Sequence, residues 1–484
     1  MRAQADTAVR GGSRRLVGTK AWIAALAILA VLAVLGAPQP ASSAPINPLC
    51  VPEAAAPPVG LSLVSATPVD ARVSDLSLRS AAMGGIEHVD VMLPSHFDPS
   101  GTTRYRTLYL LHGALGSHTD YVSLGIEAMV GNLPLIVVMP DGGSLGYYSD
   151  WYGQTAVFGP GGPAPAWETF HIRELIPWID GHYPTVATRG GRAIAGISMG
   201  GYGAMKYAAR HPELFSAAAS FSGALDIDLN YPAFPLVDEV LGVPSLLPGN
   251  GPPGLCMWGD PLTEDVVWRD NDPTYLASNL DGVALFLASG DGTLGPYDSL
   301  LNPVDLVATV VEAGAWSMNQ AFAQALDVAG IPHTDDFYGP GTHTLPYWQA
   351  DLEAFLPWVT DHLGGESVPP SFSYRSADAS FGAWGWSFQA ERTVQEFTYL
   401  TGVSSGGLTA QGSGTLDVTT DSLYQPGAVY KITAGASPFL VQAGTDGRLR
   451  FSVNLGPSHM VQQFDFGPTA PSNWKRVTVL VEAQ

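Results

Sequence analysis

Hydrophobic positions in the first three quarters of the chain alternate between two patterns. Continuous apolar runs of about six residues are followed by longer segments with helical spacing of apolar positions. Continuous runs are typical of strands that are buried on both faces, and their alternation with helices predicts a mostly parallel sheet with helices on both sides. The expected strands cover residues 106–111, 133–139, 193–197, 217–222, 283–288 and 335–338, and the expected helices cover 168–182, 201–210, 303–329 and 347–362. An alternating stretch at 76–93 predicts a hairpin that turns near residues 83–85.

The pattern changes after the linker-like pairs Gly364-Gly365 and Pro369-Pro370. Beyond them, short runs of period two are separated by Gly, Ser and Asp, at 394–400, 414–419, 429–433, 448–453 and 477–481. This pattern predicts an all-β, sandwich-like C-terminal domain. We therefore expect a signal peptide at 1–44, an N-terminal extension at 45–74, a catalytic domain at 75–365 and a β domain at 371–484.

One serine stands at a predicted strand-to-helix turn. The apolar run 193–197 ends at Ser198, between Gly196 and Gly200, and a helical pattern follows. Two other Gly-x-Ser-x-Gly matches, at Ser144 and Ser404, have no helix after them. The context of Ser198 is that of the nucleophile elbow of an α/β-hydrolase, which predicts Ser198 as the nucleophile and the N–H of Met199 as an oxyanion donor.

Two further loops lie where this fold places catalytic groups. Ala114 follows the predicted strand 106–111 and is the candidate for the second oxyanion N–H. His343 lies between the last predicted strand and the last helix of the domain, which predicts it as the base. His112 is the main rival histidine, and we expect it to orient the oxyanion loop.

The acid of the predicted triad is left open by these patterns. Asp291 comes soon after the strand 283–288, in the usual place for this residue, and Asp298 follows seven positions later in the same loop. Either carboxylate could hold the imidazole in the correct tautomer.

Charge and cysteine content narrow the function further. A formal charge of -22 at pH 7 excludes nucleic acid as an expected partner. The first 20 residues contain five basic side chains and are followed by an apolar run and small residues near Ala44, which predicts a cleaved signal peptide rather than a membrane anchor. In an oxidising compartment, Cys50 and Cys256 could form a disulfide, and two free thiols are the alternative. We expect no cofactor and no metal site.

The segment 226–273 interrupts the alternation. It is rich in Pro and Gly yet carries large apolar residues. Such an excursion between two core strands predicts an apolar cap over the active site, and a well-packed surface loop is the alternative.

Several motifs taken together resemble one family. Residues 75–362 are similar to the secreted mycolyltransferases of the antigen 85 family, within the wider esterase D group. The resemblance rests on Tyr148-Ser149-Asp150-Trp151-Tyr152, Trp167-Glu168-Thr169-Phe170, Gly196-Ile197-Ser198-Met199, Met257-Trp258-Gly259, Asn271-Asp272-Pro273 and residues 342–348. It implies that Ser198 is the nucleophile, His343 the base and Asp298 the acid. It also implies an acyl ester substrate, such as a glycolipid ester of trehalose.

The chain departs from that family at the oxyanion loop. It has His112-Gly113-Ala114-Leu115 where the family has Asp-Gly-Leu-Arg, so the charged groups that would hold trehalose are missing. The favoured hypothesis is an exported acyltransferase that passes a long acyl chain to a sugar hydroxyl. The alternatives are a secreted carboxylesterase and a cell-wall or glycan-binding protein with a vestigial hydrolase domain. In the β domain, Trp384 and Trp386 could stack on a cell-envelope glycan or lie in the core.

Overall fold

A computed structural model describes residues 50–52, 56–100, 102–155, 164–227, 257–259, 264–365, 368–435, 438–460, 462 and 474–484. The predicted signal peptide, Cys256 and most of the predicted cap lie outside these residues, so the disulfide and the cap stay predictions. Among the helices that are described, none is long and apolar enough to cross a membrane.

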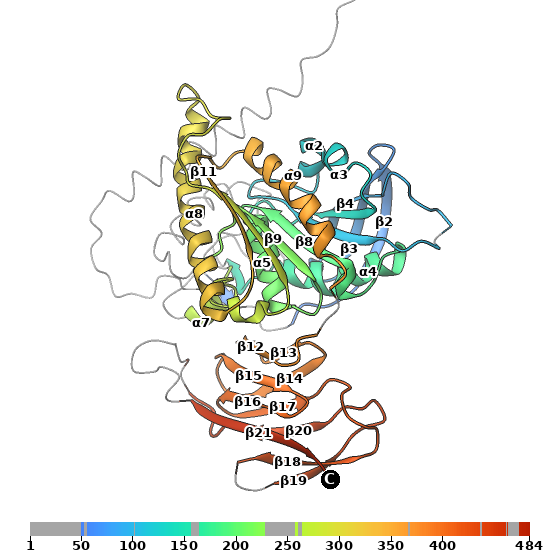
Figure 1. Cartoon of the computed structure of the whole chain (residues 1–484), viewed down its shortest axis with the longest axis vertical. Coiled ribbons are helices and arrows are strands. Elements are labelled where there is room, and N and C mark those ends of the chain that lie inside the picture. Colours follow the sequence, from blue (N-terminus) through green and yellow to red (C-terminus); the bar gives the residue numbers. More distant parts are fainter. Residues whose placement is uncertain are drawn as a thin grey trace, which may run out of the picture.

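A nine-stranded sheet forms the centre of the larger domain (Figure 1), with the strand order β11-β10-β9-β8-β5-β6-β4-β3-β2. Six strands run parallel: β5 (Arg106–Leu111), β6 (Leu135–Pro140), β8 (Arg192–Ile197), β9 (Ala217–Phe221), β10 (Ala284–Gly290) and β11 (Thr334–Gly339). An antiparallel edge follows, made of β4 (Ile86–Met92), β3 (Val73–Ser80) and β2 (Leu61–Pro68). The predicted mostly parallel sheet is confirmed. Its edge strand β2 lies in the segment 45–74, which we expected to be an extension.

Helices cover both faces of this sheet, as predicted. One face packs on α2 (Asp120–Leu124), α3 (Ile126–Val130) and α9 (Leu345–His362). The other packs on α4 (Ile176–His182), α5 (Met199–Arg210), α7 (Asp265–Asp270) and α8 (Pro303–Ala329). A π-helix at Thr169–Leu175 leads into α4. A small separate ladder pairs β1 (Cys50–Pro52) with β7 (Gly153–Thr155).

The C-terminal domain contains two antiparallel sheets. The first has the order β12-β15-β16-β21-β18-β19 and the second the order β13-β14-β17-β20. Their bounds are β12 (Phe372–Ser376), β13 (Ser380–Ala383), β14 (Trp386–Glu391), β15 (Thr398–Ser404), β16 (Gly407–Gly412), β17 (Thr415–Thr419), β18 (Val429–Ala434), β19 (Phe439–Gln442), β20 (Arg450–Asn454) and β21 (Lys475–Ala483). Apolar side chains from both sheets share one core, which is the arrangement of a sandwich.

The β domain meets the catalytic domain at the C-terminal end of α5. The guanidinium of Arg210, the last residue of α5, pairs with Asp270 at 2.5 Å and with Asp378 of the β domain at 2.7 Å. The hydroxyl of Tyr374 donates to the carbonyl of Arg210. Since α5 has 12 residues and begins next to Ser198, the two ends are about 18 Å apart. The β domain therefore contacts the end of α5 that is away from Ser198. Figure 1 shows the β domain below the large sheet.

Candidate active site

Ser198 occupies a strained turn between β8 and α5. Its φ of 55° and ψ of -117° are rare for a residue with a side chain. The flanking glycines explain how the chain tolerates this turn. A Cβ on Gly200 would collide with the carbonyl of Leu111, and a Cβ on Gly196 would collide with the backbone of Gly200. The Gly-x-Ser-x-Gly pattern is therefore a packing requirement at this position.

Ser198, His343 and Glu312 form a continuous hydrogen-bonded relay. The Oγ of Ser198 lies 2.8 Å from Nε2 of His343. On the other side of the ring, Nδ1 of His343 lies 2.6 Å from Oε2 of Glu312. A carboxylate at Nδ1 fixes the proton there, which leaves Nε2 free to accept the proton of the serine hydroxyl. The arrangement can therefore generate a serine nucleophile.

Glu312 lies on the buried face of α8 and is fully buried. Its second oxygen, Oε1, accepts hydrogen bonds from the hydroxyls of Ser222 and Ser289 at 2.7 and 2.9 Å and from the N–H of Gly290 at 2.9 Å. Because hydrogen bonds to the charged form stabilise a buried carboxylate, these three donors favour the anion that an imidazolium needs beside it.

The structure corrects the choice of acid. Asp298, the predicted acid, accepts hydrogen bonds from the hydroxyls of Thr342 and Tyr347, both at 2.7 Å, instead of from His343. Asp291, the alternative, accepts from the N–H and the hydroxyl of Thr293. Both aspartates lie in the loop after β10, and their hydrogen bonds serve that loop. The carboxylate that reaches the imidazole comes from the following helix.

The predicted oxyanion donors lie beside Ser198. A Cβ on Gly113 would lie 3.5 Å from the Cβ of Ser198, so the loop carrying Ala114 passes directly along the nucleophile. Within the described part of the chain, the backbone N–H groups of Ala114 and Met199 have no hydrogen-bond partner. Two such groups at a serine nucleophile are suited to stabilise an oxyanion.

His112 orients this loop. Its Nε2 accepts the N–H of Gly142 at 2.9 Å, and its Nδ1 lies 2.8 Å from the carbonyl of Gly113. The N–H of Leu115 donates to the carbonyl of Ser144 at 2.7 Å. The loop around Ser144, which contains one of the two other Gly-x-Ser-x-Gly matches, is thus hydrogen-bonded to the oxyanion loop.

Three segments that adjoin the loop of His343 carry exposed apolar side chains. They lie in the loop after β10, at the start of α8 and at the start of α9: Tyr297, Leu300, Leu301, Leu306, Val310 and Leu345. The hydrogen bonds of Asp298 to Thr342 and Tyr347 fasten the loop to the segment that carries His343. Leu306 and Val310 lie on the face of α8 opposite the buried face that carries Glu312. We refer to these six residues as the apolar rim.

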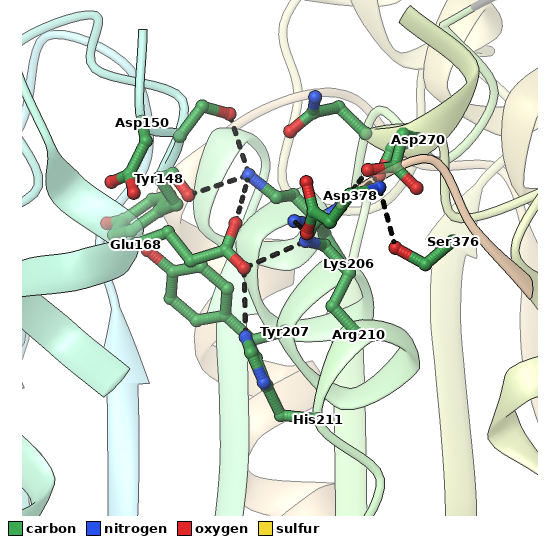
Figure 2. Close-up of polar contacts among 12 residues, drawn as sticks. Tyr148, Asp150, Glu168, Lys206, Tyr207, Arg210, His211, Asp270, Ser376 and Asp378 are labelled. Atoms are coloured by element: carbon green, nitrogen blue, oxygen red, sulfur yellow. Dashed lines mark hydrogen bonds and ion pairs between the residues drawn. The ribbon is translucent and has the colours of Figure 1, made fainter. Parts of the chain in front are cut away.

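A buried charge cluster holds the helix that begins at Ser198 (Figure 2). Lys206 of α5 is fully buried, and its ammonium lies 2.9 Å from Glu168. Glu168 also pairs with Arg210 at 2.8 Å and with His211 at 2.9 Å. Burial alone would raise the pKa of Glu168, but the charges of Arg210 and Lys206 outweigh it and hold the pKa well below its usual range.

The two tryptophans of the β domain lie in its core. Trp384 and Trp386 are both only 4% exposed. The guanidinium of Arg189, from the catalytic domain, covers the ring of Trp384 at 4.8 Å from the ring centroid. The core interpretation of the two residues therefore holds, and neither ring offers a free face for a sugar.

Comparison with known proteins gives consistent matches over the catalytic domain. Residues 80–359 match the model of a family described as putative esterase. The chain is 32% identical to Esterase Rv1288 of Mycobacterium tuberculosis over 302 residues, which cover 61% of this chain and 61% of that protein. It therefore spans less than two thirds of that relative's length.

A second group of relatives carries names that denote acyl transfer. The chain is 32% identical over 272 residues to the diacylglycerol acyltransferase/mycolyltransferase Ag85B of Mycolicibacterium smegmatis, covering 55% of this chain and 79% of that protein. The solved structure of MPT51 of Mycobacterium tuberculosis aligns with a TM-score of 0.49 and 22% identity, over 61% of this chain and all of that one.

Proposed function

We propose that this chain, which belongs to the putative esterase family and is related to the Ag85 acyltransferases, transfers a long acyl chain from a sugar ester to a sugar hydroxyl. Members of this group are serine-dependent esterases or acyltransferases. The observation that carries the proposal is the relay from Ser198 through His343 to Glu312.

The first half of the reaction forms an acyl-enzyme. His343 Nε2 takes the proton of Ser198 as Oγ attacks the ester carbonyl carbon. The N–H groups of Met199 and Ala114 donate to the oxyanion, and Glu312 stabilises the imidazolium. The tetrahedral intermediate collapses, and the leaving sugar oxygen takes the proton from His343.

The second half releases the acyl group to an acceptor. An acceptor hydroxyl gives its proton to His343 and attacks the acyl carbonyl, and Ser198 then regains that proton as the new ester leaves. With a sugar as acceptor the enzyme is a transferase, and with water it is a carboxylesterase. Two members of the apolar rim support a long acyl donor: Leu345 follows His343 by two positions, and Tyr297 lies in the loop that Asp298 fastens to Thr342.

Hydrolysis is the second candidate, and one observation favours it. The oxyanion loop carries His112-Gly113-Ala114-Leu115, without the acidic and basic groups that the antigen 85 resemblance would require for trehalose. The proposal therefore names a sugar hydroxyl as the acyl acceptor and does not identify that sugar as trehalose. Export through the predicted signal peptide fits an acyl acceptor in the cell envelope.

The deciding experiment incubates the purified chain with a long-chain trehalose ester, with and without a second sugar, and identifies the products by mass spectrometry. Transfer predicts acylated acceptor whose amount rises with acceptor concentration. Fatty acid as the sole product would replace transfer by hydrolysis. Ser198→Ala must abolish both products, and absence of any turnover in the wild type would leave the glycan-binding hypothesis.

A further inference from the structure

Two histidines and two aspartates meet on one face of the antiparallel edge of the sheet. Asp75 on β3 lies directly opposite Asp90 on β4, and His88 precedes Asp90 by two positions on the same strand. Since alternate residues of a strand point to the same side, these three side chains share one face. His118, from the loop after β5, stacks its ring on His88 with the ring centroids 5.2 Å apart.

The donor atoms of this cluster are close enough for one small cation. Oδ1 of Asp75 lies 3.0 Å from Nδ1 of His88 and 3.9 Å from Nε2 of His118. One donor atom from each of these three residues lies within 4.8 Å of the other two. Two ligands of a tetrahedral ion at 2.0–2.1 Å are about 3.4 Å apart, so a small inward shift of the side chains would close the site.

Asp90 points to a missing positive charge. It is 1% exposed, and neither of its carboxylate oxygens has a hydrogen-bond partner within the described parts of the chain. A buried carboxylate without a partner is costly, and a second carboxylate directly opposite, here that of Asp75, makes it more so. A divalent cation between them would neutralise both carboxylates.

We propose that Asp75, His88 and His118 bind a divalent transition-metal ion of the zinc type, with Asp90 supplying the second negative charge beside it. Two imidazoles with carboxylate oxygens are a donor set that suits zinc, cobalt or nickel, whereas magnesium and calcium prefer oxygen ligands alone. Metal binding is independent of the acyl-transfer proposal.

The proposed metal site lies next to Asp141, a residue that contacts the oxyanion loop through His112. With Nε2 facing Asp75, His118 turns Nδ1 toward Asp141, whose Oδ2 is 3.7 Å away. Asp141 also accepts the N–H of Gly143 and lies 3.3 Å from Nε2 of His112. A carboxylate behind a ligating histidine is a common second partner at metal sites. A bound ion would thus fix His118 and, through Asp141, restrain the loop that carries Ala114.

The test titrates zinc chloride alone into the purified full chain after removal of the affinity tag and treatment with a chelator. Isothermal titration calorimetry should give one ion per chain. His88→Ala and His118→Ala should each weaken binding at least tenfold, and Asp90→Asn should weaken it by about tenfold. Magnesium and calcium should give no comparable binding.

Matched controls separate the site from adventitious histidine binding. His182 and His362 are exposed histidines, each stacked on a tryptophan of its own helix with the ring centroids 3.9 Å apart. His182→Ala and His362→Ala should bind zinc like the wild type. Circular dichroism verifies folding of every variant. Asp75→Asn replaces the carboxylate ligand by an amide of nearly the same shape and should also weaken zinc binding.

A second readout reports geometry. Cobalt bound to the wild type should give the visible absorption of a tetrahedral ion, and this absorption should vanish in the His88→Ala, His118→Ala double variant. Stoichiometric zinc that raises the midpoint of thermal unfolding only when both histidines are present supports the site. Absence of binding, or equal binding by the double variant, would overturn it.

Discussion

Glu312 determines how His343 is oriented, because its Oε2 is the acceptor at Nδ1. We expect Glu312→Gln to lower kcat by about 10³–10⁴-fold with a smaller change in KM. An amide at this position favours the wrong tautomer of His343, and it does not stabilise the imidazolium that forms during the reaction. Steady-state kinetics on a soluble ester measure this loss.

Asp298→Asn is the matched control for that variant. Asp298 holds a loop through Thr342 and Tyr347 and does not touch His343. Its loss should therefore lower the rate by less than about tenfold. A larger loss of kcat in Asp298→Asn than in Glu312→Gln would indicate that Asp298 is the acid, as predicted from the sequence.

The mistaken choice of acid has a physical reason. The prediction placed the acid in the loop after β10, which is its usual position in this fold. In this structure the carboxylate that contacts His343 belongs to Glu312 of α8. A signal was present: Glu312 is the only charged residue between Asp305 and Asp327. It also lies at helical spacing with Ala308 and Ala315 on the buried face of α8. A lone carboxylate on an apolar helical stripe is a candidate for a buried partner.

His171 predicts how stability responds to pH. It is 4% exposed, and both ring nitrogens have partners: the hydroxyl of Tyr207 and the carbonyl of Asp141, each at 2.9 Å. Burial lowers its pKa from 6.5 to about 4. Between these values the unfolded chain binds a proton at His171 that the folded chain does not, so the contribution of His171 to the free energy of unfolding should fall by up to about 3 kcal/mol as pH drops from 6.5 to 4.

Urea unfolding at several pH values tests this expectation. His171→Phe removes the titrating group, and the decline in the free energy of unfolding between pH 6.5 and 4 should become shallower than in the wild type. His182→Gln, at an exposed position, should retain the wild-type slope. Parallel slopes for His171→Phe and the wild type would show that His171 does not contribute.

At the scale of elements, α5 is fixed by charges as well as by packing. Lys206 donates to the carbonyl of Tyr148 at 3.0 Å and to the hydroxyl of Ser149 at 2.8 Å, in addition to its pair with Glu168 (Figure 2). Burial lowers the pKa of Lys206, and the charge of Glu168 opposes that shift. The ammonium therefore joins α5 to two other segments, one containing Tyr148 and Ser149 and one containing Glu168.

Lys206→Met should lower the free energy of unfolding by about 3–5 kcal/mol, because it leaves buried acceptors without their donor. Lys431→Met is the control, since the pair of Lys431 with Glu482 is partly exposed and surface pairs contribute about 0–1 kcal/mol. Chemical denaturation of both variants measures the difference. Equal losses would mean that the buried ammonium contributes no more than a surface charge.

Some elements were predictable in detail and others were not. Helix α8 coincides with the predicted helix 303–329, because Asn302 caps its start and Gly330 takes a left-handed conformation at its end. The predicted helix 168–182 is instead a π-helix followed by α4, with Thr169 bonded to Asp150. Such an irregularity depends on tertiary partners, which local pattern does not reveal. Strand β2 was missed because it is an exposed edge strand without alternating burial.

At the scale of the whole molecule, the interface couples the two domains. The side-chain amide of Asn279 pairs with both the N–H and the carbonyl of Arg375, each at 2.9 Å. The hydroxyls of Tyr275 and Tyr399 lie 2.6 Å apart across the same interface. Apolar residues of the β domain, including Phe397 and Trp474, belong to the larger core cluster of the catalytic domain. We therefore expect the domains to unfold together.

Asn279→Ala should weaken this coupling, because it leaves two partly buried backbone groups of Arg375 at the interface without their partner. Differential scanning calorimetry should show one transition for the wild type and a split or broadened transition for the variant. Lys431→Met, on β18, which is separated from the interface strand β12 by three strands of the same sheet, should keep a single transition. Two separate transitions already in the wild type would contradict the coupling.

The central claim is that Ser198 carries the acyl group between donor and acceptor. Rapid quenching of the wild type with a long-chain ester, followed by intact-protein and peptide mass spectrometry, tests it most directly. We expect a mass increase of one acyl group on the peptide that contains Ser198, decaying faster when acceptor sugar is added, and no such species in Ser198→Ala. Acylation at another residue, or undiminished turnover by Ser198→Ala, would contradict it.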